Sequence, residues 1–254
     1  MKFLPGFLAV FGFLELVNGA AIDGRIVNGV VAAITDFPWQ ASLRRNLGRH
    51  FCGGTLISSD IVLTAAHCVD SFAANEVNVV TGSDSLAKGG QYHGVKNIIY
   101  HANYSAGAVS SWENDIALVK LSTEAPVSAR QAPASVGVDY VTGNTSAALS
   151  GWGRVIHPGY SLPTALQSVN LTILSNEECQ AYHSLTIHDT HICAFSTYGE
   201  GVCSGDSGGG LIVDGAVVGI TSWARLCAVG VPDVYTRVSS FVDWIDEKSE
   251  ELSN

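Results

Sequence analysis

GDSGG at residues 205–209 is the stretch that most constrains this chain, because two earlier stretches complete it. They are TAAHC at residues 64–68 and NDIAL at residues 114–118. Each stretch alone is weak evidence, since an isolated histidine rarely has a special role and a short glycine-rich string can be an ordinary turn. Together they supply an imidazole, a carboxylate and a hydroxyl, the three groups that serine-based nucleophilic catalysis uses.

The chemistry gives each of these groups a role. A neutral imidazole can take the proton of a serine hydroxyl during attack on a carbonyl and return it to the leaving amine. A buried carboxylate fixes the tautomer of that imidazole and stabilises its charged form. We therefore expect Ser207 to be the nucleophile, His67 the general base and then the general acid, and Asp115 the orienting carboxylate.

The composition indicates a folded, β-rich domain. Of the 254 residues, 47 % are hydrophobic and 14 % are charged, so the chain can bury a sizeable core and is not typical of disorder. The 27 glycines and the recurring short apolar segments favour an all-β barrel or sandwich. The segments expected as strands are 53–58, 60–64, 77–81, 116–121, 147–151, 211–213 and 217–222.

A helix is predicted near the C-terminus, over residues 239–246. Ser240 is the expected N-cap, with Asp243 three residues later. Phe241, Trp244 and Ile245 share one face at helical spacing, so this helix should pack on the core.

The N-terminus predicts a targeting signal. Lys2 precedes an apolar run over residues 3–13, and small residues follow at 19–21. This layout is typical of a signal peptide spanning residues 1–19, with cleavage between 19 and 21. No later stretch is long and apolar enough to span a membrane. The mature protein is therefore expected to be secreted, extracellular and not bound to a membrane.

Charge and cysteine content narrow the possible partners. The net charge is −10 and no basic stripe is present, which argues against nucleic-acid binding. Six cysteines in a secreted chain predict three disulfides, and their spacing alone leaves 15 connectivities open. Because no Cys-x-x-Cys pair occurs, a zinc site is not expected. Asp84 and Glu76 form no obvious ligand array, so we expect neither a metal nor a cofactor.

Taken together, these motifs identify a family. The chain resembles the trypsin/chymotrypsin serine endopeptidases from Ile26 to about Ile245, including IVNG at 26–29, SGWG at 150–153 and VYTRV at 234–238. The resemblance implies an all-β fold of two six-stranded antiparallel β-barrels with the active site between them, followed by a C-terminal α-helix. It also implies protein or peptide substrates, and protein protease inhibitors and a monomeric state are further expectations.

The resemblance also implies roles for backbone groups and cysteines. The N–H groups of Gly205 and Ser207 should form the oxyanion hole. One departure is Gly210, which stands where the family commonly has proline. The implied disulfides are Cys52–Cys68, Cys179–Cys193 and Cys203–Cys227.

Activation by cleavage is a further implication. Arg25 precedes Ile26, and in the family the new α-ammonium group pairs with the aspartate before the nucleophile, here Asp206. Residues 20–25 would then be an activation propeptide and residues 26–254 the protease domain. A separate trypsin-like protease should make the cut.

The specificity pocket leaves two interpretations open. By family matching, its base is Gly201 and Val202, its wall is residues 222–224 (Ser222, Trp223 and Ala224), and Asp233 lies low in it. Gly201 stands where trypsins have an aspartate, which argues against simple trypsin specificity. In the first, preferred interpretation, Val202 and Ala224 screen Asp233, and an elastase-like or chymotrypsin-like pocket accepts small to medium apolar side chains. In the second, Asp233 is reachable and basic side chains are also accepted.

Other functions and modifications complete the expectations. A catalytically inactive relative that acts as a binding protein is the main alternative, although all three triad residues are present. A processing protease of the trypsin type is disfavoured by Gly201. Three triplets fit the N-glycosylation pattern, at Asn103, Asn144 and Asn170.

Overall fold

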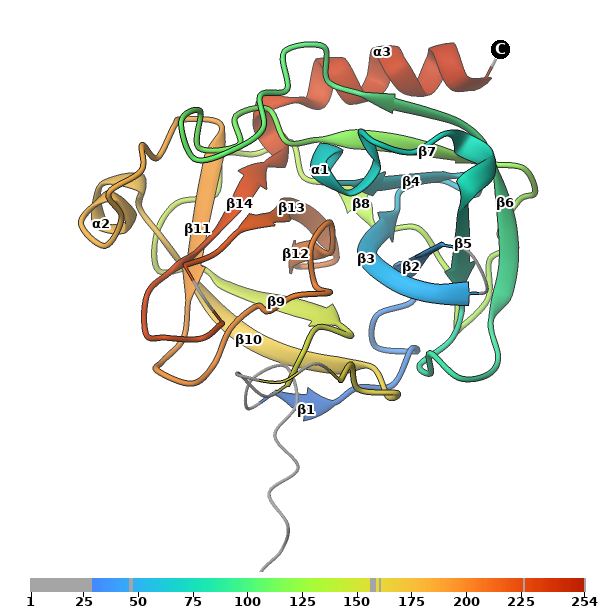
Figure 1. Cartoon of the computed structure of the whole chain (residues 1–254), viewed down its shortest axis with the longest axis horizontal. Helices are drawn as coiled ribbons and strands as arrows, with labels where there is room; N and C mark the ends of the chain where they lie inside the picture. The colour runs from blue at the N-terminus through green and yellow to red at the C-terminus, as the bar shows by residue number, and fades with distance from the viewer. Residues whose placement is uncertain (1–28, 46–47, 156–158, 160, 226, 254) are drawn as a thin grey trace, which may run out of the picture.

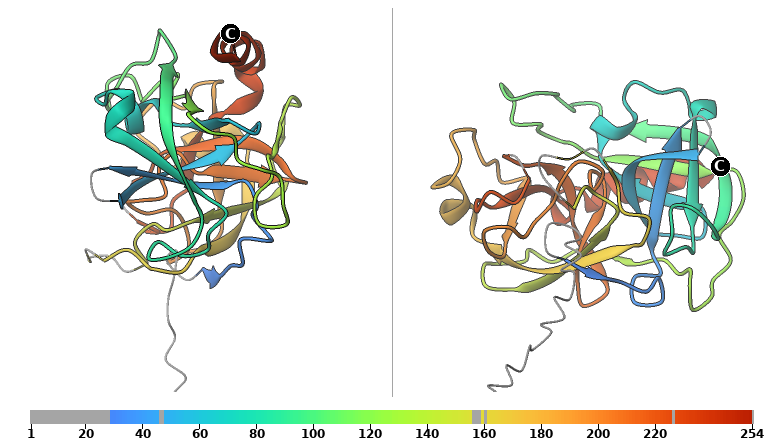
Figure 2. Two further views of the ribbon diagram at one scale, coloured as in Figure 1. Left: turned by 90° about the vertical axis from the view of Figure 1, so that its right-hand side faces the viewer. Right: turned by 60° about the horizontal axis from the view of Figure 1, so that its bottom comes forward.

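Two β-barrels lie side by side and make up most of the molecule (Figure 1). The computed structural model describes residues 29–45, 48–155, 159, 161–225 and 227–253. The left view of Figure 2 shows the C-terminal helix end-on, on the outside of the molecule. Within the described residues no helix is both long and apolar enough to cross a membrane.

The first barrel closes through six antiparallel strands in the order β2-β3-β4-β7-β6-β5, with β5 paired back to β2. The strands are β2 (Gln40–Arg45), β3 (Arg49–Leu56), β4 (Ile61–Thr64), β5 (Val77–Thr81), β6 (Gln91–Tyr100) and β7 (Ala117–Leu121). Closure leaves no free sheet edge in this barrel, so every strand has two partners.

The second barrel also has six antiparallel strands, in the order β9-β10-β11-β14-β13-β12, and β12 pairs back to β9. They are β9 (Ser146–Gly151), β10 (Gln167–Leu174), β11 (His191–Phe195), β12 (Gly210–Val213), β13 (Ala216–Trp223) and β14 (Asp233–Arg237). Two short strands add to its outside: β1 (Val30–Val31) pairs with β10, and β8 (Ser135–Val136) pairs in parallel with β13. The predicted architecture of two six-stranded barrels is confirmed.

Each barrel has its own apolar interior. In β10, buried and more exposed residues alternate, as a strand with one face on the core requires. Leu63 and Leu118 are fully buried in the first barrel, whereas Leu149, Ile192 and Leu211 are fully buried in the second. Residues of β12 and β13 also join the first cluster, so the two cores touch where the barrels meet.

The predicted strand segments overlap β3, β4, β5, β7, β9, β12 and β13, although their ends differ by one or more residues in most cases. The strands β2, β6, β10, β11 and β14 were not predicted. β6 has the pattern QYHGVKNIIY, in which a glycine and several polar residues interrupt the apolar positions. Pairing with β5 and β7 holds this segment in the extended conformation that its own sequence does not specify.

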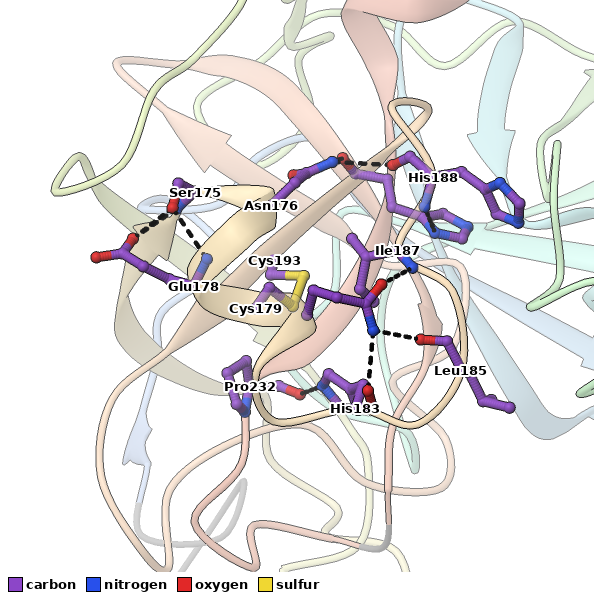
Figure 3. The surroundings of a disulfide bond; sticks show 12 residues. Ser175, Asn176, Glu178, Cys179, His183, Leu185, Ile187, His188, Cys193 and Pro232 are labelled. Carbon is purple, nitrogen blue, oxygen red and sulfur yellow. Dashed lines mark hydrogen bonds between the residues drawn. A yellow bond between two sulfur atoms is a disulfide. The ribbon is translucent and has the colours of Figure 1, made fainter.

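Short helices lie between the strands. They are α1 (Ala66–Val69), α2 (Asn176–Gln180) and the 3-10 turns η2 (Ala74–Glu76) and η3 (Val238–Ser240). Ser175 and Glu178 form a capping box at the start of α2, and the Cys179–Cys193 disulfide attaches α2 to β11 (Figure 3). A capped and cross-linked single turn can persist where an isolated helix of this length could not.

The C-terminal helix α3 (Val242–Ser253) begins later and ends later than predicted. Ser240 is not its N-cap, because Ser240 belongs to η3 and Phe241 has a non-helical φ of −127°. The Ile245 N–H donates to the Phe241 carbonyl at 2.8 Å, so Phe241 is where α-helical bonding starts. The predicted apolar face is correct: Phe241 and Ile245 are buried, and Trp244 packs against the same cluster.

Replacing Ile245 by alanine should loosen α3 from the core. Ile245 is 1 % exposed, so the substitution leaves a cavity and should lower the free energy of unfolding by about 2–4 kcal/mol. Denaturant unfolding measures this loss. Asp246→Ala is the matched control, because Asp246 is the exposed next residue on the same helix. Equal stability of the two variants would contradict the docking of α3.

Candidate active site

An imidazole–carboxylate pair lies where the two barrels meet. His67 lies on α1, directly after β4, and Asp115 lies just before β7. His67 Nδ1 is 2.7 Å from Asp115 Oδ2, and the His67 backbone N–H donates to Asp115 Oδ1 at 2.9 Å. Because Nδ1 donates to the carboxylate, Nε2 is the ring position at which the neutral imidazole can accept a proton.

The Asp115 carboxylate is fully buried and has a third donor from the second barrel. The Ser222 hydroxyl donates to Asp115 Oδ2 at 2.6 Å, and the Thr236 hydroxyl donates to the Asp115 backbone carbonyl at 2.8 Å. A buried carboxylate is stable only when such donors replace water. The sequence predicted Ser222 only as a pocket wall, and no motif signals its bond to Asp115.

The surroundings of His67 stabilise its charged form relative to a free imidazole. Burial of the ring opposes protonation, but the hydrogen bond and negative charge of Asp115, together with the charge of Asp70, outweigh it and hold the pKa of His67 above its ordinary value. The carboxylate therefore stabilises an imidazolium at this position.

Ser207 lies on a loop that is fixed by hydrogen bonds to both barrels. The Gly53 N–H of β3 donates to the Ser207 carbonyl at 2.8 Å, and the Gly208 N–H donates to the Thr221 carbonyl of β13 at 2.8 Å. Gly208 has a φ of +78°, and a Cβ there would lie 3.2 Å from Cys68 Sγ. Since Cys68 follows His67 in the chain, the serine loop and the imidazole occupy the same junction.

Gly205 has a conformation that favours glycine, with a φ of +109°. A Cβ at this position would lie 3.1 Å from both Gly153 Cα and a methyl carbon of Leu162. Within the described part of the chain, neither the Gly205 N–H nor the Ser207 N–H donates a hydrogen bond. Both amides are therefore available as donors beside the Ser207 hydroxyl.

His50 contacts the backbone of this loop at Gly205, and it was not identified as a site residue from the sequence. Its Nε2 is 2.9 Å from the Gly205 carbonyl, and its Nδ1 is 2.8 Å from Ser42 Oγ, which accepts from Arg44 Nε. Since Ser42 accepts from arginine, it can donate to Nδ1, and the Nε2–H then donates to Gly205. Burial lowers the pKa of His50 to about 4, so the ring is neutral at pH 7.

Asp206 points away from the cleft into the protein. Its carboxylate is 1 % exposed and accepts from the Gly153 N–H at 2.7 Å and the Cys203 N–H at 3.0 Å. A Cβ at Gly153 would overlap this carboxylate. Burial raises the pKa of Asp206 to about 6. Arg25 and Ile26, the other expected activation residues, lie outside the described residues.

A cavity of about 190 Å³ opens beside Ser207. Of the predicted pocket residues, four line it: Val202, Ser222, Trp223 and Ala224. Gly201 and Asp233 are not among the described residues that line this cavity. The Val202 backbone N–H donates to Asp233 Oδ2 at 2.9 Å, so the carboxyl group lies behind the Val202 backbone.

The Asp233 carboxyl is 4 % exposed. Burial, aided by repulsion from Asp206 and opposed by the Val202 hydrogen bond, raises the pKa of Asp233 to about 8. Gly201 has a φ of +152°, and a Cβ there would lie 2.7 Å from Asp233 Oδ2. A side chain at position 201 would therefore clash with the carboxyl group of Asp233 where it now lies.

Three disulfides join the pairs Cys52–Cys68, Cys179–Cys193 and Cys203–Cys227, which are the pairs that the family resemblance implies. The first ties β3 to the His67 turn, and the third ties the chain before Ser207 to the pocket wall. In the described part of the chain, the group with metal-ligand reach is Cys52, His67 and Cys68. Its two sulfurs are bonded to each other, so this group does not fit a metal.

The three possible glycosylation sites, Asn103, Asn144 and Asn170, all lie on the surface with exposed side chains. Asn170 points outward from β10, whereas Asn103 lies in the loop between β6 and β7. Their exposure is compatible with the predicted modification, which stays a prediction.

The sequence model of the Trypsin family matches residues 26–245 of this chain. Hypodermin-B of Hypoderma lineatum is 39 % identical over 233 residues, covering 90 % of this chain and 89 % of the relative. Trypsin of Sarcophaga bullata is 36 % identical (97 % and 99 % covered), and trypsin II-P29 of Gallus gallus is 38 % identical (97 % and 98 % covered).

The fold and these matches define a serine-type endopeptidase, a hydrolase of peptide bonds whose substrates are proteins. The chain belongs to the trypsin family.

Replacing Asp233 by asparagine should stabilise the protein increasingly as the pH rises. The folded-state pKa of about 8 exceeds the ordinary value of 3.8, so the stabilisation from the protonated group is present in full below pH 3.8 and is lost as the pH rises toward 8. Asp233→Asn should therefore gain about 2–4 kcal/mol more over the parent at pH 8 than at pH 5.

Thermal unfolding at the two pH values measures the difference, with Ser207→Ala in every sample to prevent self-digestion. Asp214→Asn is the control, because Asp214 is exposed and its φ of +49° suits asparagine. A stabilisation by Asp233→Asn that did not depend on pH would contradict the buried, protonated carboxyl.

Proposed function

We propose that this protease hydrolyses peptide bonds through an acyl-enzyme at Ser207, with His67 as general base and acid and Asp115 as the orienting carboxylate. The observation that carries the proposal is the 2.7 Å bond between His67 Nδ1 and the buried Asp115, beside the loop of Ser207. That bond leaves Nε2 as the proton acceptor on the side of the ring away from the carboxylate.

The reaction follows from these groups. As Ser207 Oγ attacks the substrate carbonyl carbon, its proton passes to His67 Nε2 and negative charge develops on the carbonyl oxygen. The N–H groups of Gly205 and Ser207 stabilise that oxygen. The imidazolium then protonates the leaving amine, the C–N bond breaks, and water repeats the sequence on the ester.

Replacing Ser207 by alanine should abolish covalent labelling by a fluorophosphonate probe and lower kcat by at least about 10⁴-fold. The precursor is first treated with trypsin, and N-terminal sequencing checks that the new chain begins at Ile26. Ser122→Ala is the control, because Ser122 is an exposed serine just after β7 and does not line the cavity beside Ser207. A correctly processed wild-type sample that neither hydrolyses peptides nor reacts with the probe would instead favour a non-catalytic binding protein.

The proposed preference before the scissile bond is for small to medium apolar residues. Val202 and the Ala224 methyl narrow the 190 Å³ cavity, and the Asp233 carboxyl lies behind Val202. With a pKa of about 8, that carboxyl is mostly uncharged at pH 7, so it offers little attraction to a lysine or arginine. One methylene in such a pocket is worth about 1–3 kcal/mol, so the preference should be graded.

Basic specificity through Asp233 is the alternative, and the relatives named trypsin favour it. The two readings differ in the effect of Asp233→Asn. If Asp233 stays screened, cleavage of a peptide library should change less than about 3-fold at any residue type, because a neutral group replaces a mostly neutral group. A large, selective loss of cleavage after Lys or Arg would instead establish the alternative.

Secretion and activation complete the proposal. Residues 1–19 would direct secretion, cleavage after Arg25 by a trypsin-like protease would remove residues 20–25, and the Ile26 ammonium group would pair with Asp206. The family match starts at Ile26, and the Asp206 carboxylate lies in a pocket with only two backbone donors among the described residues. A monomer that protein protease inhibitors can block is the simplest active form.

A further inference from the structure

A second, larger cavity borders the serine loop. It has a volume of about 470 Å³ and shares Ser204 with the 190 Å³ cavity, but its other walls are different. Arg49 and Phe51 at the start of β3 form one wall, and Arg154 and Leu162 form another. The two cavities therefore flank the segment that carries Gly205 and Ser207.

The course that the proposed reaction implies for the leaving peptide passes this cavity. A substrate whose side chain fills the smaller cavity places its carbonyl at Ser207, and its chain must continue past Gly205. Gly205 itself lines the larger cavity. Because an extended chain advances about 3.3 Å per residue, the first one or two residues after the scissile bond lie over this cavity.

The lining is positively charged in a protein that is otherwise acidic. Arg49 and Arg154 both line the cavity, and no described carboxylate does. The whole chain has only 13 Lys and Arg against 23 Asp and Glu. A guanidinium stays charged at any working pH and can donate two parallel hydrogen bonds to one carboxylate. The neutral His50 ring in the same lining adds no charge.

Both arginines are attached to ordered backbone. Arg49 pairs with Arg45 at the β2–β3 register, and the Arg154 N–H donates to the Ser204 carbonyl at 3.0 Å. The Arg49 side chain is exposed, whereas Arg154 is half-buried. The positive charge is therefore held beside the reacting loop. An ion pair with the half-buried Arg154 is screened less by salt than one with the exposed Arg49.

We propose that Arg49 and Arg154 select an acidic side chain at the first or second position after the scissile bond. The inference rests on the proposed function, because it assigns hydrolysis to Ser207. The substrate class becomes an apolar residue followed within two positions by aspartate or glutamate. Arg49 and Arg154 act by binding the substrate carboxylate and take no part in the proton transfers.

Internally quenched peptides that differ at a single position test the proposal. Each contains valine before the scissile bond and glutamate, glutamine or lysine at the second position after it, with a second series for the first position. In at least one series the activated enzyme should show kcat/KM about 5- to 20-fold higher for glutamate than for lysine. The ratio should shrink toward 1 in 1 M salt, where the screening length falls to about 3 Å.

Charge reversal separates a direct contact from a general field. Arg49→Gln should lower the glutamate-to-lysine ratio at least about 3-fold, and Arg49→Glu should favour lysine. Arg154→Gln should lower the ratio as well. The matched control is Arg130→Gln, because Arg130 is an exposed arginine that pairs with Asp84 at 3.4 Å and lines neither cavity. The control should keep the wild-type ratio.

A nitroanilide substrate with valine before the scissile bond keeps the two proposals apart, because it has no side chain after that bond. Hydrolysis of the nitroanilide together with equal rates for the glutamate and lysine peptides would overturn the charge selection alone. No hydrolysis of any substrate would overturn the proposed function. A ratio that Arg49→Gln and Arg130→Gln changed equally would also refute the proposed site.

Discussion

The whole site depends on the hydrogen bonds that hold the Ser207 loop between the barrels. One bond comes from Gly53 of the first barrel and the other goes to Thr221 of the second. Neither barrel could orient this loop alone, because a loop with partners on one side would keep its rotational freedom. Glycine at 208 lets the loop come close enough, since a Cβ there would overlap the Thr64 hydroxyl.

The buried Asp115 carboxylate also connects the two barrels. His67 donates to it from the first barrel and Ser222 donates to it from the second. Each donor reduces the cost of burying a charge, and together they fix the direction in which the carboxylate faces. The polar group that is most expensive to bury therefore helps to hold the barrels in register, and the same contacts orient His67.

Short motifs could predict local features of the site, because each motif specifies a local backbone requirement. The glycines around Ser207 permit the positive φ angles that Gly205 and Gly208 have. The two-barrel fold and the disulfide pairs came from the family resemblance. Strands such as β6 were missed because polar residues break their alternation, and pairing with neighbours decides their conformation.

Contacts between distant segments could not be predicted in the same way. His50 reaches the Gly205 carbonyl across 155 positions of sequence, and no pattern near either residue marks that contact. Ser222 was assigned to the pocket wall, yet its hydroxyl binds Asp115. The position of Asp233 behind Val202 was expected only through the family resemblance, because it depends on how β14 packs and no local signal specifies it.

The residue types at positions 201 and 233 depend on each other. A side chain at 201 would collide with the Asp233 carboxyl, so an acid at 233 requires glycine at 201. Burial there, together with repulsion from Asp206, favours the neutral form of Asp233. The burial of Asp233 therefore suppresses the negative charge that would attract a basic substrate side chain. Arg49 and Arg154 line the other cavity, across the serine loop from Asp233. The two proposals together assign charge selection to the leaving peptide and selection by size to the residue before the scissile bond.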